Sequence, residues 1–186
     1  MADAPEFPSK EGVIEAWKDG TLGDLLEQQL SVLVGEPFRY IGRASDLVWL
    51  GFGPLESAPP RPDPDRRVAH YALHVQCPLR LDIESRAAVG SWDIWEQPDA
   101  PGRTPEDFEW DVQGANLFDV QAAELNEMLS RDVPTVIRVR ADSQGSLTVD
   151  MTNELCLRVF PSVSYRQENW RFFVPSGPHL VVLPEG

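Results

Sequence analysis

The chain has 186 residues, 42% of them apolar, and a formal net charge of −14. This length and apolar content suit one globular domain with a sizeable core. The charge disfavours binding to nucleic acid or to an anionic membrane surface, and it favours a basic protein partner, a cation, or solubility alone.

Two further features bear on the cellular compartment. Cys77 and Cys156 lie in strand-like segments outside any C-x-x-C motif, so we expect buried free thiols. The N-terminus lacks the basic and apolar regions of a signal peptide, and no apolar run is long enough to span a membrane. We therefore expect a cytoplasmic protein, and the preference for arginine over lysine is typical of a GC-rich bacterial genome.

The N-terminal part of the chain predicts helices followed by strands. Residues 1–10 are polar and contain prolines, and we expect them to be loose. From Glu11 to Val34 the apolar residues recur at helical spacing, with an interruption at Gly20 that predicts two helical segments. Apolar runs at residues 38–42 and 46–52 predict two strands.

The next segment alternates between apolar and polar residues and predicts a sheet. Residues 53–67 contain five prolines and are expected to form a long exposed loop. Val68–Cys77 and Leu79–Glu84 alternate as half-buried strands do, and Pro78 between them indicates a bulge or a bend. Residues 88–95 are expected to add a short strand.

The second half predicts a central helix and then an antiparallel meander. The apolar stripe of Leu117–Arg131 indicates a helix, and the turn at Asp142–Gly145 begins a series of short alternating strands. The predicted fold class is α+β, with a largely antiparallel sheet and two main helices, one N-terminal and one central. We expect a single domain over residues 11–186, with an acidic loop and helix inserted at about 85–132.

The acidic middle of the chain is its most unusual feature. Residues 82–132 contain thirteen Asp or Glu and three Arg, which is most of the negative charge of the protein. A disordered acidic tract would be poor in aromatic residues, whereas this one is rich in tryptophan, a residue enriched at binding hot spots. The candidate binding residues of this region are Glu106, Asp107, Glu109, Asp111, Trp92, Trp95 and Trp110.

The sequence H-x3-H-x2-C of His70, His74 and Cys77 invites a metal-site interpretation. On a strand the two histidines lie roughly 13 Å apart, because each residue advances the chain by about 3.3 Å. A metal ion ligated at about 2 Å cannot bind both, and Cys77 has the opposite parity. We therefore predict no metal and no cofactor, and we retain His70 and His74 as residues of a shallow binding face.

No catalytic motif is present in the sequence. Gly90-Ser91-Trp92 lacks the G-x-S-x-G frame of a nucleophile elbow, and Gly51-Phe52-Gly53-Pro54 lacks the features of a phosphate-binding loop. The carboxylates at 106–111 do not match a calcium-binding loop. These absences favour a protein that is not an enzyme.

The C-terminal third contains a series of hairpin-forming segments, Asp142–Val149, Leu155–Pro161 and Glu168–Phe172. In these segments the chain resembles a class of uncharacterised bacterial proteins that includes immunity-type proteins of polymorphic toxin systems. The resemblance implies a cytoplasmic protein that neutralises a partner by binding it. It carries over no functional residue, because the class has no shared catalytic motif.

Three functional hypotheses follow from the sequence. The first is a non-enzymatic, immunity-like module that binds a basic protein through its acidic surface. The second is a small-ligand binding protein or enzyme with a groove on the sheet face of His70 and His74. The third is a stable domain whose acidity serves solubility alone.

Overall fold

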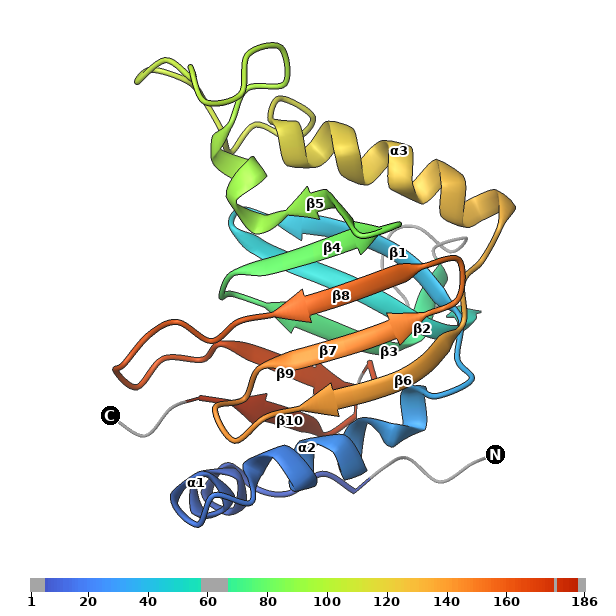
Figure 1. The fold of residues 1–186 in the computed structure, drawn as a ribbon, viewed down its shortest axis with the longest axis vertical. Coiled ribbons are helices and arrows are strands. Elements are labelled where there is room, and N and C mark those ends of the chain that lie inside the picture. The colour runs from blue at the N-terminus through green and yellow to red at the C-terminus, as the bar shows by residue number, and fades with distance from the viewer. Residues whose placement is uncertain (1–5, 58–66, 176, 184–186) are drawn as a thin grey trace.

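The computed structural model describes residues 6–57, 67–175 and 177–183. These residues form three α-helices and ten strands, and the strands make two antiparallel sheets of five (Figure 1). The α+β class with antiparallel strands is confirmed. The sequence did not indicate that the strands divide between two sheets.

The two sheets pack face to face. In the rear sheet of Figure 1 the strand order is β1 (Phe38–Ala44), β2 (Leu47–Ser57), β3 (Arg67–Val75), β9 (Trp170–Phe173) and β10 (His179–Val182). In the front sheet the order is β5 (Arg86–Gly90), β4 (Leu79–Ile83), β8 (Leu155–Val159), β7 (Leu147–Met151) and β6 (Val136–Ala141). Inward residues of both sheets, such as Leu50, Leu73 and Leu157, belong to one buried hydrophobic cluster.

The helices cover the edges of the sheets. The central helix α3 (Leu117–Arg131) packs along edge strands β1 and β5, and the side-chain amide of Asn126 pairs with the backbone of Ile41. At the opposite edges α1 (Lys10–Lys18) contacts β10, and α2 (Leu22–Leu30), followed by the 3-10 turn η1 (Ser31–Leu33), contacts β6 (Figure 1). Exposed edge strands can pair with other chains, and these helices prevent that.

Several local predictions agree with the structure. The N-terminal helical region divides at Gly20, whose φ of 73° suits glycine, and α3 has the predicted bounds. The turn at Asp142–Gly145 is closed by the Asp142 carboxylate, which accepts hydrogen bonds from the backbone N–H groups of Gln144 and Ser146. The bend at Pro78 is the point where the chain passes from the rear sheet to the front sheet.

Two boundaries differ from those predicted. Strand β2 continues to Ser57, so the start of the expected 53–67 loop is strand, while residues 58–66 lie outside the described part. The expected strand at 88–95 was also misplaced. Glu84 and Ser85 adopt φ values of 48° and 65° in a tight hairpin turn, so β5 begins at Arg86 and ends at Gly90. Such a turn usually contains Asn or Gly, and this sequence has neither there.

Residues 6–10, part of the segment expected to be loose, are held against the fold. Ser9 caps α1 by accepting a hydrogen bond from the Gly12 N–H, and the Phe7 ring contacts Phe172 in the rear sheet. Residues 1–5, which belong to the segment expected to be loose, lie outside the described residues. Within the described ranges, no helix is long and apolar enough to cross a membrane.

Candidate functional site

The acidic predicted residues gather on one protruding segment, residues 91–116, which we call the acidic projection. It consists of the 3-10 turn η2 (Ser91–Trp95) and the loop that leads to α3, and it rises beyond the two sheets (Figure 1). Seven Asp or Glu and a single Arg lie within it. It therefore carries a concentrated negative charge away from the body of the protein.

The base of the projection is fixed to the edge of the front sheet. The Gly90 N–H donates to the Asp93 carboxylate at 2.7 Å, and the Leu79 N–H donates to the Ser91 hydroxyl at 3.0 Å. Ile94 is buried, and burial raises the pKa of Asp93. This anchoring turns the two tryptophans of η2 outward, so that Trp92 is 71% exposed and Trp95 is 40% exposed.

The first half of the loop is closed by Glu96. Its carboxylate accepts hydrogen bonds from the Thr104 hydroxyl at 2.6 Å and from the Gly102 N–H at 2.7 Å, and these lower its pKa. The Thr104 hydroxyl in turn accepts a hydrogen bond from the Gln97 N–H at 3.0 Å. The segment from Glu96 to Thr104 therefore has a defined shape.

The second half of the loop is held by an aromatic contact and by a helix cap. The rings of Trp95 and Trp110 are 4.1 Å apart, and Trp110 packs against the hydrophobic core. The buried Asn116 side chain donates to the Trp110 carbonyl at 2.7 Å and accepts from the Asp119 N–H at 2.9 Å. One side chain thus caps α3 and fixes the loop that precedes it.

A buried ion pair fastens the projection to the rear sheet. The guanidinium of Arg43, in β1, donates to both carboxylate oxygens of Asp119, in α3, at 2.8 and 2.6 Å. Asp119 also accepts from the Gln113 side chain and the Gly114 N–H, and Arg43 donates to the Val112 carbonyl. Strand, helix and loop therefore meet at one carboxylate.

Sequence reasoning did not identify Arg43 or Asp119 as residues of this site. An N-cap signal was available, because Asn116 precedes the helical pattern and Asp119 lies in its first turn. No comparable signal pointed to Arg43, which lies in β1, far from α3 in the sequence.

The four predicted carboxylates lie in the second half of the loop of the projection. Glu106, Asp107, Glu109 and Asp111 are all exposed. None of them forms an ion pair within 4 Å with a side chain of the described residues. Their negative charge is therefore available to a partner.

A shallow hollow of about 440 Å³ lies in the same half of the loop. Its walls combine apolar groups with two acids, and its lining is Pro105, Asp107, Phe108, Glu109, Val112 and Ala115. Lys and Arg side chains have an apolar stem and a cationic head, and this lining matches both parts.

No family model, curated protein or solved structure matches this chain. The functional argument therefore depends on the chemistry of the surface itself.

The two predicted histidines lie in β3 and contact different neighbours. His70 is 2.8 Å from the Glu56 carboxylate and contacts the Tyr71 ring, next to the bulge that shifts the pairing of β2 with β3. His74 instead lies opposite Trp49 and contacts the Phe173 ring. Burial and the neighbouring Arg171 guanidinium lower the pKa of His74.

The groups that could bind a metal or act as a nucleophile are separated. Among the described residues, no three His, Cys, Asp or Glu side chains gather in an arrangement that could hold a metal ion. Both cysteines are free, and burial raises the pKa of Cys77 to about 12 and that of Cys156 to about 11. Cys156 is only half-buried, whereas the sequence predicted burial of both thiols. Neither thiol ionises near neutral pH.

Proposed function

We propose that this protein is a non-catalytic binding module that presents the acidic projection to a basic protein partner. The resemblance of its C-terminal third to immunity-type proteins favours a partner that is neutralised by being bound. The acidic surface has the sign required for a basic partner.

The observation that carries the proposal is the exposure of Trp92 on the same anchored segment as four carboxylates that have no ion-pair partner among the described residues. Acidity alone would explain solubility, but an exposed tryptophan pair lowers solubility and therefore needs another explanation. Tryptophan supplies a large apolar contact, and the carboxylates of the projection supply charge complementarity.

The support of the projection also favours binding. The hydrogen bonds of Glu96 and the buried pair of Arg43 and Asp119 fix the loop before a partner arrives. Binding then requires little loss of conformational entropy. The hollow between Asp107 and Glu109 receives a Lys or Arg side chain of the partner.

The test is comparative capture from an extract of the source organism. The wild type is expected to retain a basic protein at low salt and to release it at high salt. A projection variant, with Glu106→Gln, Asp107→Asn, Glu109→Gln and Asp111→Asn, is expected to lose that protein, and so is Trp92→Ala.

A matched control separates this surface from net charge. Changing the exposed residues Glu6, Glu15, Asp19 and Glu124 to their amides removes the same number of charges away from the projection, and this variant should still capture the protein. Equal losses in the control and projection variants, or no basic protein retained by the wild type, would overturn the proposal.

A further inference from the structure

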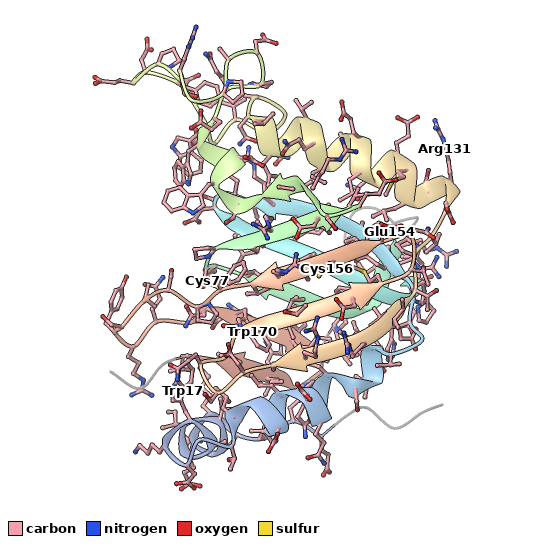
Figure 2. All side chains as sticks on the ribbon, viewed as in Figure 1. Trp17, Cys77, Arg131, Glu154, Cys156 and Trp170 are labelled. Carbon is pink, nitrogen blue, oxygen red and sulfur yellow. The ribbon has the colours of Figure 1, made fainter. Side chains whose placement is uncertain are left out.

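The two central rows of side chains on the outward face of the front sheet have a net charge opposite to that of the whole protein. None of the described helices lies across this face, and Cys156 is near its centre (Figure 2). Strand register places its side chains in two parallel rows that cross four strands from β4 to β6. The first row is Asp82, Cys156, Asp150 and Arg138, and the second is Arg80, Arg158, Thr148 and Arg140.

Each aspartate of this face holds two arginines. Asp82 pairs with Arg80 at 2.8 Å and also with Arg158. Asp150 pairs with Arg138 at 3.0 Å and with Arg140 at 2.9 Å. Within these two rows, four arginines against two aspartates leave an excess of two positive charges.

The arginines are held in place but are not covered. Their side chains are 35–61% exposed, while the Asp82 side chain is only 7% exposed. Arg80 lies directly opposite Arg158, and like charges in directly opposed positions of a sheet are destabilising. An additional carboxylate bound here would offset that repulsion, and arginine binds carboxylates with two parallel hydrogen bonds.

We infer that this arginine face binds the acidic projection of a second copy of the chain. The two surfaces have opposite charge, and the exposed Glu106, Asp107, Glu109 and Asp111 have no ion-pair partner among the described residues of their own chain. The projection is fixed by the Arg43–Asp119 pair, and the arginines of its own face pair with Asp82 and Asp150 and not with its carboxylates. The inference shares the projection with the proposed function but adds a second surface and a second occupant.

The geometry of this contact determines the kind of assembly. It joins two different surfaces, so it is head-to-tail and leaves a free face and a free projection at the ends. Four carboxylates against four arginines are fewer residues than the roughly 20–30 a side of a standard interface. The association is therefore weak and visible only at high protein concentration. A basic partner bound to the projection would compete with this contact and cause the assembly to dissociate.

The salt dependence of this assembly differs from that of an ordinary ion pair. Two chains of formal net charge −14 repel each other at long range. At an ionic strength of about 0.15 M charges are screened beyond about 8 Å, while contacts at hydrogen-bond distance persist. Self-association is therefore strongest at intermediate salt and declines at both extremes.

The experiment is sedimentation equilibrium of the purified protein up to about 1 mM, where contacts of this size become populated. The wild type is expected to show a mass that rises with concentration. The projection variant defined above and a face variant, Arg138→Gln with Arg140→Gln, are each expected to remain monomeric. Mixing these two variants should restore a species of twice the monomer mass, because each supplies the surface that the other lacks.

The control is Lys10→Gln with Arg131→Gln, which removes the same positive charge from exposed sites elsewhere and should associate as the wild type does. A monomeric wild type at every salt concentration would overturn the inference, as would a mixture that fails to associate. Binding of a short DNA duplex by a monomeric wild type, lost in the face variant, would show that the face binds phosphates instead. If the wild type is monomeric but still captures a basic protein, only this inference is overturned. If it self-associates but captures no basic protein, only the proposed function is overturned.

Discussion

Replacing Arg43 with methionine tests how the acidic projection is anchored. The guanidinium makes two ionic hydrogen bonds to Asp119, at 2.8 and 2.6 Å, and both side chains are almost fully buried. Methionine is a long apolar replacement, but it leaves the carboxylate without its cation. Removing one partner of a buried pair costs about 3–5 kcal/mol. Since Asp119 keeps two hydrogen bonds from the loop, we expect a loss at the low end, about 3 kcal/mol.

Urea unfolding followed by circular dichroism measures this loss. The matched control is Arg131→Met, which breaks an exposed pair with Glu127 and should cost less than about 0.5 kcal/mol. Amide hydrogen exchange should also accelerate in residues 96–116 more than in a core variant of equal stability, because the loop loses its attachment. If Arg43→Met is no more destabilising than Arg131→Met, the buried pair does not anchor the projection.

Three further predictions concern the rear sheet and its edge. A Cβ atom at Gly42 would lie 2.2 Å from the Trp49 ring, so Gly42→Ala should lower the unfolding free energy by about 1–3 kcal/mol, and adding Trp49→Leu should recover part of it. Asn126→Leu removes both hydrogen bonds to the Ile41 backbone at the sheet edge and should cost about 1–3 kcal/mol in urea unfolding, with more aggregation on light scattering. Burial lowers the pKa of His74 in the folded state. As the pH falls below about 6.5, His74 is therefore protonated in the unfolded chain before it is protonated in the folded protein, and the free energy of unfolding declines. His74→Gln should flatten this decline between about pH 7 and pH 5, and an unchanged slope would contradict the assignment.

The sequence predicted those parts of the fold that depend on local patterns. The bounds of α3 followed from the spacing of its apolar residues, and the turn at Asp142–Gly145 followed from turn chemistry. The turn at Glu84 and Ser85 was missed because those residues rarely adopt positive φ. The division into two sheets was not predictable, since strand alternation shows which residues are buried but not which sheet they face.

The sequence predicted only those parts of the candidate site that depend on local composition. The density of carboxylates and tryptophans between residues 92 and 111 is a property of composition, and it is visible in the sequence. The Arg43–Asp119 pair depends on two residues that are 76 positions apart, and no local pattern connects them. The bulge between Phe52 and Leu55, which lies beside His70, was not predicted either, because bulges leave little trace in sequence.

The central claim is that the acidic projection is a binding surface for a basic protein. Its most direct test is the association rate constant of the captured partner, measured at low and at high ionic strength by stopped-flow tryptophan fluorescence. The wild type and the amide control outside the projection should bind fast at low salt and at least about tenfold more slowly at high salt, because electrostatic steering is screened. The projection variant should bind slowly at both. A rate that does not change with salt, or that is equal in the wild type and the projection variant, would contradict the claim.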